Sequence, residues 1–365
     1  MTIYYIILFL ICAFIVIPTS KKVDSVLFCI LFSFSFIFFA GFRPQEASTD
    51  YVVYVELFND LNTDITLQNL LGFAEPTFVL IGSLIKSLGL PVVWLFIIYA
   101  IIGISFKTAA ILKYSEFIIP SLLVYYSNFF LLHEMTQIRV GVASGIFLLA
   151  VQYIYQKEKW KYFGCIGLAI LFHYSAVVYL PIYFLNANEI NKKKYYSIII
   201  ISIVIGFLKI PFIDYLKYVP IETIQKKQEL YSGVLEMGIM STNINLFNVA
   251  VLIDIFICLI FLYNCDFIAK KNRYFILFLK IYIVGLCSFY ILASFPPIAF
   301  RIKELFIVSQ FISIPFLFYL FPTRKSISIS ILILICLLFL YINTYNTHLV
   351  RDYDFFKIIY NSCNL

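Results

Sequence analysis

The chain has 365 residues, of which 62% are hydrophobic and only 13% are charged. A soluble domain carries about 25% charged residues, so this composition excludes a soluble protein and leaves no room for a separate soluble domain. The net charge of +7 does not indicate nucleic-acid binding, because the basic residues fall in short clusters between apolar runs, as in the cytoplasmic loops of membrane proteins.

Apolar runs long enough to cross a hydrocarbon layer of about 30 Å recur from one end of the chain to the other. We therefore predict an all-α, polytopic integral membrane protein, a single transmembrane domain over residues 1–365 with about 11–13 membrane segments. The candidate segments are 3–17, 23–41, 76–89, 91–112, 117–132, 138–155, 161–185, 195–213, 244–263, 274–293, 302–320 and 326–342.

The first two segments are joined by Lys21 and Lys22. No basic residue precedes the run 3–17, so this run does not read as a cleavable signal peptide. Because the lysines follow the run, we expect the N-terminus outside and the first connection in the cytoplasm.

Residues 42–75 form the first long polar stretch, which is acidic and contains no lysine, and we expect it on the outer face. Its acidic residues are Glu46, Asp50, Glu56, Asp60, Asp64 and Glu75. Within it, residues 51–61 predict a short amphipathic helix lying in the membrane interface, with Tyr51 and Tyr54 on its apolar side. Arg43 ends the second segment at this face, and Asp50 stands at the entry to the short helix. Capping of that helix by Thr49 or Asp50 explains these residues as well as a functional role does.

Simple alternation of crossings places every basic cluster in the cytoplasm except Lys157 to Lys161. Two segments offer a different arrangement. The run 76–89 is short for a full crossing, and the run 161–185 is interrupted at His173-Tyr174-Ser175. If both segments dip into the membrane and return, all basic clusters become cytoplasmic and Arg139 moves to the outer face.

Ionisable residues at the margins of apolar runs are the candidate functional residues, because a charge at such a depth is costly unless it is paired, hydrated or bound to a ligand. Arg139 lies beside Gln137 in a segment whose small residues, Gly141 to Gly145, indicate packing against other helices. A buried guanidinium needs an anion, and its planar fork suits phosphate or carboxylate. We therefore predict an anion-binding role for Arg139.

His173 ends an apolar run, and its imidazole can accept or donate a proton near neutral pH. A hydrogen-bonded core histidine is the alternative. Arg301 comes three residues before Glu304, at a helix start after the break Pro296-Pro297. These two residues form either an ion pair within the helix or part of a binding site.

The remaining polar features predict no metal site. Eight cysteines are scattered without C-x-x-C or Cys/His ligand spacing, so neither a disulfide framework nor a zinc site is expected. The second long polar stretch, 214–243, has mixed charge and is expected outside. The tail 351–360 contains Asp352-Tyr353-Asp354, which we interpret as part of an interfacial tail rather than as a metal ligand set. Phosphate-binding loops and dinucleotide fingerprints are absent.

Four blocks of the sequence together resemble the EpsG-type polysaccharide polymerases, a group that includes many O-antigen polymerases (Wzy). The blocks are 41–58, 75–89, 137–185 and 299–318. Ile138-Arg139-x-x-x-Ala143 and Phe172-His173-x-Ser175, separated by a basic loop, are their most specific part. In the first block the glycine common in the family is replaced by Ser48, whereas Thr49-Asp50-Tyr51 is kept.

This resemblance implies a metal-independent glycosyltransferase of the GT-C type in the bacterial inner membrane, without a cofactor. It would polymerise undecaprenyl-pyrophosphate-linked oligosaccharide repeat units into O-antigen, or a related capsular polysaccharide or exopolysaccharide, at the outer face. Its partners would be the lipid-linked glycan as donor and acceptor, membrane lipids and a chain-length regulator, and no nucleic acid.

The expected catalytic residues are Asp50, His173 and Arg139. Arg139 and Arg301 would contact the pyrophosphate, Asp50 or His173 would activate the acceptor hydroxyl, and Arg43 would complete the carrier site. Substrate-binding residues are expected to be Arg43, Tyr51, Tyr54, Glu75, Gln137, Arg301 and Glu304.

Two other functions fit the same composition. A flippase or transporter would move the lipid-linked unit without chemistry, although we find no inverted repeat, which is common in transporters. An O-antigen ligase would differ only in its acceptor.

Overall fold

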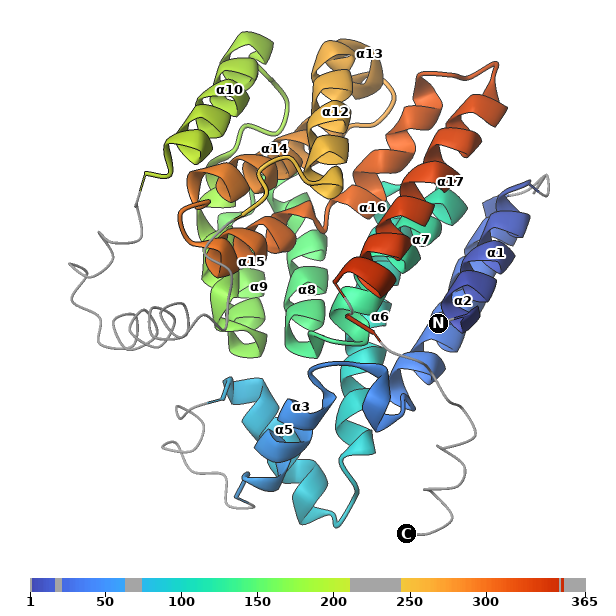
Figure 1. Cartoon of the computed structure of the whole chain (residues 1–365), viewed down its shortest axis with the longest axis vertical. Helices are drawn as coiled ribbons and strands as arrows, with labels where there is room; N and C mark the ends of the chain where they lie inside the picture. The colour runs from blue at the N-terminus through green and yellow to red at the C-terminus, as the bar shows by residue number, and fades with distance from the viewer. Residues whose placement is uncertain (1, 17–21, 63–73, 211–243, 348, 351–365) are drawn as a thin grey trace. The chain divides into compact units, whose positions relative to one another are not determined.

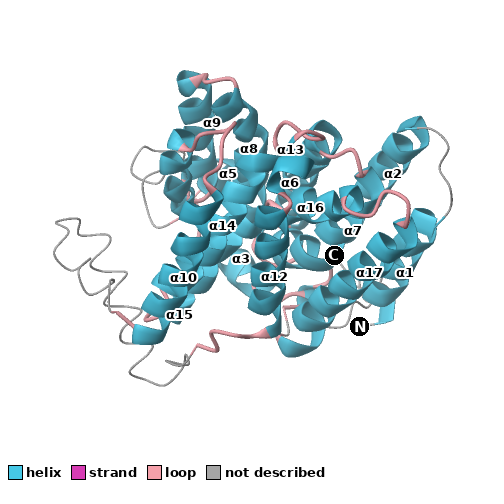
Figure 2. Cartoon of the chain, turned by 90° about the horizontal axis from the view of Figure 1, so that it is seen from above, coloured by secondary structure: helices cyan, strands magenta, loops and turns pink. Residues whose placement is uncertain are grey.

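The computed structural model describes residues 2–16, 22–62, 74–210, 244–347 and 349–350. The expected outer loop 214–243 and the tail 351–360 lie outside the described residues, as do residues 63–73 of the first polar stretch. The described residues are helical with short connections and contain no strand (Figure 2), only an isolated bridge between Ser48 and Val350. The predicted all-α fold is confirmed.

Five helices in the described part of the chain are long and apolar enough to cross a membrane. They are Val23–Gly41, Val93–Tyr114, Ile138–Tyr155, Pro296–Tyr319 and Lys325–Asn346. Shorter apolar helices accompany them, namely Ile3–Cys12, Pro76–Ser87, Tyr174–Phe184, Val249–Tyr263 and Phe275–Ile291. The protein is therefore a polytopic helical membrane protein, as its composition predicts.

The chain forms two compact units. Unit 1 comprises Met1–Phe184 and Gln310–Leu365, and unit 2 comprises Leu185–Ser309. The helices of unit 1 are α1 (Thr2–Val16), α2 (Lys22–Gly41), η1 (Gln45–Ala47), α3 (Tyr51–Asn59), α5 (Pro76–Ser87), α6 (Val93–Tyr114), α7 (Ile118–Val124), η2 (Tyr125–Glu134), α8 (Ile138–Tyr155), α9 (Lys159–Phe172), η3 (Tyr174–Phe184), α16 (Gln310–Ser313), η5 (Ile314–Tyr319), α17 (Lys325–Tyr341) and η6 (Ile342–Asn346) (Figure 1).

Small residues bring α2, α6 and α8 together in unit 1. A Cβ atom at Gly145 of α8 would lie 2.9 Å from Phe106 Cβ of α6, and the hydroxyls of Ser33 on α2 and Thr108 on α6 are 2.6 Å apart. Most residues of α8 are buried, including Ala143 and Ser144. The prediction that this segment faces other helices is confirmed, because close approach of backbones drives packing where lipid supplies no hydrophobic force.

The segment 161–185 is interrupted where the sequence predicts. The α-helix α9 ends at Phe172, His173 is extended, and the 3₁₀-helix η3 follows. The hydroxyl of Tyr162, near the start of α9, donates to Tyr179 O at 2.7 Å, and the rings of Tyr162 and Tyr183 are 5.4 Å apart. The start of α9 thus contacts the C-terminal part of η3. The two helices therefore form an antiparallel hairpin with His173 at its tip.

The short segment 76–89 is also confirmed as a short helix, α5, which has 12 residues and a length of about 18 Å. The helix ends at Ser87, and Gly89, two residues later, has a φ of 67° in the left-handed region that glycine adopts without strain. Lys86 Nζ on α5 donates to Asn59 O at 2.6 Å and to Leu61 O at 2.7 Å, which joins α5 to the C-terminal end of α3.

Unit 2 contains α10 (Lys192–Leu208), α12 (Val249–Tyr263), α13 (Cys265–Ala269), α14 (Phe275–Ile291) and α15 (Pro296–Ile307). The Lys303 ammonium of α15 pairs with the Asp254 carboxylate of α12 at 2.6 Å, and the Tyr282 hydroxyl of α14 donates to the same carboxylate at 2.9 Å. The expected start of the segment 302–320 is wrong: α15 already begins at Pro296, because proline is tolerated in the first turn of a helix.

Candidate functional site

Three ionisable side chains from separate parts of the sequence meet in unit 1. Glu75 Oε1 is 2.9 Å from His173 Nδ1, and Glu75 Oε2 accepts from an Nη1–H of Arg139. The Glu75 side chain is 8% exposed, whereas those of Arg139 and His173 are 22% and 20% exposed. A buried carboxylate therefore bridges a guanidinium and an imidazole that both remain partly accessible. We call these three residues the Glu75 cluster.

The local sequence explains why Glu75 and His173 are held in place. Glu75 precedes Pro76, which restricts it to the extended conformation observed, with φ −64° and ψ 144°. His173 ends α9 in an extended conformation, and its backbone N–H donates to Ala169 O at 2.9 Å. The hydroxyl of Thr77, in the first turn of α5, donates to Leu171 O at 2.9 Å. The start of α5 is thus fastened to the tip of the α9–η3 hairpin.

Glu75 is ionised in this arrangement. Burial alone would raise the pKa of its carboxyl group, but the hydrogen bond from His173 and the positive charge of Arg139 outweigh burial and bring the pKa below its ordinary value of 4.5. A carboxylate only accepts hydrogen bonds, so His173 Nδ1 carries the proton. In the neutral imidazole the lone pair then resides on Nε2, which gives His173 the character of a general base oriented by a carboxylate.

Aromatic rings lie against both Arg43 and Arg139. The Arg139 guanidinium carbon is 5.3 Å from the Tyr54 ring centre, and the Arg43 guanidinium carbon is 4.2 Å from the Phe96 ring centre. The Tyr54 and Phe96 rings contact each other at 6.2 Å, and Tyr51 stacks on Phe96 at 4.6 Å. Two tyrosines of α3 thus connect the aromatic rings around Arg139 with those around Arg43. Aromatic faces attract cations, so these rings stabilise both guanidinium groups.

Arg43 and Asp50 differ in their surroundings. Arg43 is only 3% exposed, and its Nη1 donates to Ala40 O at 2.8 Å and to Glu134 O at 3.0 Å. Asp50 is half-buried at the start of α3 and makes no capping hydrogen bond, while the Thr49 hydroxyl donates to it at 3.3 Å. Capping therefore does not explain Asp50. Its catalytic role and the substrate-binding role of Arg43 stay predictions.

Three other predicted site residues are not part of the Glu75 cluster. Gln137 is half-buried at the N-terminal end of α8, two residues before Arg139. Arg301 is exposed and Glu304 half-buried on α15 of unit 2. Their roles stay predictions.

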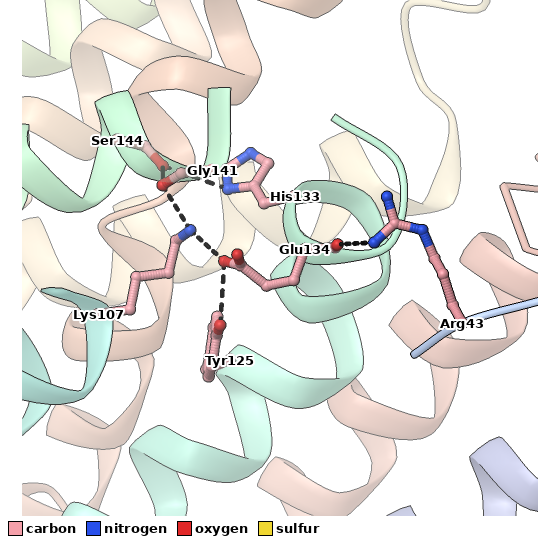
Figure 3. Close-up of polar contacts among 7 residues, drawn as sticks. All are labelled: Arg43, Lys107, Tyr125, His133, Glu134, Gly141 and Ser144. Atoms are coloured by element: carbon pink, nitrogen blue, oxygen red, sulfur yellow. Dashed lines mark hydrogen bonds and ion pairs between the residues drawn. The ribbon is translucent and has the colours of Figure 1, made fainter. Parts of the chain in front are cut away.

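In a second charged group of unit 1, sequence reasoning marked Glu134 as an ionisable residue beside an apolar run but missed its partner Lys107. The Lys107 ammonium on α6 pairs with the Glu134 carboxylate at the end of η2, and the Tyr125 hydroxyl donates to that carboxylate at 3.0 Å (Figure 3). The side chains of Lys107 and Glu134 are 0% and 1% exposed. Lys107 is the only charged residue in the run 91–112, and this isolation was the available signal.

The fold and this geometry define a polytopic α-helical membrane protein with a partly accessible cluster of glutamate, arginine and histidine. The EpsG family model matches residues 25–361, which is most of the chain. The chain belongs to the EpsG family.

A curated relative is similar to part of the chain. The amylovoran biosynthesis protein AmsC of Erwinia amylovora is 25% identical over 212 residues, which is 55% of this chain and 55% of AmsC. The chain thus spans about half the length of the curated relative it matches. No solved structure matches the chain.

Proposed function

We propose that this protein is a glycosyltransferase of the bacterial inner membrane. It polymerises oligosaccharide repeat units carried on undecaprenyl pyrophosphate into O-antigen or a related capsular polysaccharide or exopolysaccharide. Membership of the EpsG family and the similarity to a protein named for amylovoran biosynthesis support a role in polysaccharide assembly. The observation that carries the proposal is the Glu75 cluster. In it, the Glu75 carboxylate contacts both the partly accessible Arg139 guanidinium and the His173 imidazole, which it orients.

The proposed reaction is the transfer of the growing chain to a new lipid-linked unit. A hydroxyl oxygen of the new unit attacks the anomeric carbon of the growing chain, and the bond from that carbon to the diphosphate oxygen breaks. The hydroxyl proton passes to His173 Nε2, and the diphosphate leaves on its lipid. Negative charge develops on the leaving diphosphate, so a guanidinium such as Arg139 stabilises the transition state more than the ground state.

The other predicted residues complete this proposal. Asp50 is the second candidate for the base. Arg43 completes the carrier site, with Gln137 as a further contact. The substrate-binding roles expected for Arg301 and Glu304 stay predictions. Tyr54 is only 4% exposed, which favours support of Arg139 over direct stacking on a sugar, whereas Tyr51 is half-buried. Guanidinium groups take the place of a metal ion in this GT-C type of transfer.

The ends of α8 and α9 support an outer-face location for the Glu75 cluster. The two helices pack against each other and are joined by a short connection, so Arg139 at the start of α8 and His173 beyond the end of α9 lie at one end of the pair. The basic residues Lys157 to Lys161 lie at the other end, about 26 Å away along α8. Lysine-rich ends are typical of the cytoplasmic side, which supports an outer-face location for the cluster.

Cysteine labelling tests this orientation. In a background without native cysteines, Thr49→Cys and Gln156→Cys each place one thiol at an exposed position. We expect a membrane-impermeant maleimide to label Thr49→Cys in intact spheroplasts and Gln156→Cys only after permeabilisation. The reverse pattern would place the cluster on the cytoplasmic side and overturn the proposed reaction site.

Gene deletion with glycan electrophoresis tests the function. A polymerase deletion leaves surface glycan with a single repeat unit, whereas a ligase deletion leaves no surface polymer and retains polymer on its carrier. A flippase deletion leaves unpolymerised units inside the cell. Complementation with Arg139→Ala should yield single repeats, and Arg324→Ala, an exposed arginine at the start of α17, should restore the full ladder. A full ladder from Arg139→Ala would refute the role of Arg139.

A further inference from the structure

A charged pair is completely enclosed within unit 1. Lys107 Nζ donates to a carboxylate oxygen of Glu134 and, at 2.7 Å, to the backbone oxygen of Gly141 (Figure 3). The Tyr125 hydroxyl donates to the same carboxylate oxygen. With side chains 0% and 1% exposed, Lys107 and Glu134 cannot touch a substrate. A buried pair is costly to desolvate and contributes little net stability, so its presence calls for another role.

The pair connects the segments that carry Arg43 and Arg139. Gly141 lies in the first turn of α8, two residues after Arg139. The backbone oxygen of Glu134 accepts from Arg43 Nη1 at 3.0 Å. The Glu134 side chain is therefore connected, through Lys107, to the turn that carries Arg139. Its backbone oxygen accepts a hydrogen bond from Arg43.

Two glycines make room for the Glu134 carboxylate beside Lys107. A Cβ atom at Gly103 would lie 2.6 Å from Glu134 Oε2, and one at Gly141 would lie 3.2 Å from the same oxygen. A side chain at Gly103 would displace the carboxylate, and one at Gly141 would force a shift of a few tenths of an ångström. Since contacts between apolar helices are non-directional, these polar contacts determine how the first turn of α8 is rotated about its axis.

We propose that Lys107 and Glu134 are positioning residues that orient the Arg139 guanidinium for binding to a diphosphate. This inference rests on the proposed function, because it assigns the ligand of Arg139. A diphosphate differs from a monophosphate by one phosphoryl group. An arginine with a fixed orientation can form an additional charge-assisted hydrogen bond with that group. The pair therefore determines preference for diphosphate over monophosphate without contacting either.

Binding of two short lipid probes tests the proposal on the purified full-length protein in detergent. Wild type should bind farnesyl pyrophosphate more tightly than farnesyl phosphate by about tenfold, the size of one charge-assisted hydrogen bond. The double variant Lys107→Met/Glu134→Gln replaces the pair with neutral side chains of similar size, so no buried charge is left unpaired. We expect the preference of this variant for farnesyl pyrophosphate over farnesyl phosphate to fall below about threefold. The affinity for farnesyl phosphate should not change, because only the orientation of Arg139 is lost.

Lys113→Gln is the matched control. Lys113 also joins α6 to α8, through Gln152, but at the end of α8 remote from Arg139, so this variant should keep the wild-type preference. If the double variant does not reach the membrane, Tyr125→Phe removes only one hydrogen bond from the Glu134 carboxylate and should lower the preference partially.

The outcomes separate the two proposals. No diphosphate preference in wild type, or full preference in Arg139→Ala, overturns the assigned ligand of Arg139 and the function built on it. A preference that is lost in Arg139→Ala but kept in both Lys107→Met/Glu134→Gln and Tyr125→Phe overturns only the positioning role. An equal loss of binding for both probes in the double variant also overturns it, because general loosening of the fold does not discriminate between them.

Discussion

Replacing Glu75 by glutamine perturbs the candidate site with the least change in shape. The carboxylate accepts one hydrogen bond from Arg139 and one from His173. Glutamine keeps one oxygen acceptor, but its NH₂ group then faces a donor. One of the two contacts is therefore lost, and Arg139, which is 22% exposed, loses the negative charge that it faces.

The size of the effect follows from these contacts. A hydrogen bond to a charged group contributes about 1.5–3 kcal/mol. Breaking a fully buried ion pair costs about 3–5 kcal/mol. Because Arg139 is partly exposed, Glu75→Gln should cost less than this, about 2 kcal/mol of unfolding free energy. If His173 loses its orientation, the same energy expressed at the transition state lowers the polymerisation rate roughly 10- to 100-fold.

The pH dependence gives an independent test of the same group. The pKa of Glu75 is below its ordinary value of 4.5 in the folded protein, so the ionised group stabilises the fold at pH values above the unfolded pKa. This stabilisation is lost as the pH falls through the lower folded pKa. The difference in stability between wild type and Glu75→Gln should thus be constant from about pH 7 to about pH 5.5 and shrink only in more acidic solution.

Thermal unfolding in detergent measures the stability difference, and chain growth from purified lipid-linked repeat units, resolved by electrophoresis, measures the rate. A wild-type glycan ladder with unchanged stability would refute the bridging role of Glu75. A stability difference that already disappears between pH 7 and pH 6 would contradict the ionised state assigned to it.

Two paired substitutions test the rest of unit 1. His173→Gln should reduce chain growth by about 10²- to 10⁴-fold if His173 is the base, and Asp50→Asn should then have a far smaller effect; the opposite order in the same assay would move the base to Asp50. Gly103→Ala should destabilise the protein by about 1–3 kcal/mol through overpacking against Glu134. Gly164→Ala, where an added Cβ meets nothing within 4 Å, should not lower the melting temperature.

The long helices could be predicted from the sequence because their apolar runs are uninterrupted. The expected segment 138–155 coincides with α8, and 23–41 lies within α2. The break at His173 was also visible, since polar residues interrupt an apolar run there. The expected segment 117–132 instead divides into α7 and the π-helix η2, which continues to Glu134. Propensity does not indicate such a change of helix type, because it depends on local packing.

The partners within the candidate site could not be predicted in the same way. Glu75 is separated from Arg139 by 64 positions and from His173 by 98. Pairing over such distances depends on how each helix is rotated, and helices that are apolar all round carry no stripe that fixes their rotation. The sequence identified these residues one by one as charges near apolar runs, but Glu75 was expected to bind substrate, and its position between Arg139 and His173 required the structure.

Each unit uses a buried lysine, a carboxylate and a tyrosine hydroxyl to fix a helix that carries a candidate arginine. In unit 2 the group is Lys303, Asp254 and Tyr282, and Lys303 is two residues after the exposed Arg301. Residues two positions apart on an α-helix point about 200° from each other. Because the ion pair with Asp254 holds Lys303 in the interior, Arg301 points toward the exterior of the unit. Gly141, two residues after Arg139, likewise faces the Glu134 carboxylate. In a medium where apolar contacts do not define rotation, we infer that an interior polar group two positions from each arginine sets the rotation of the helix that carries it.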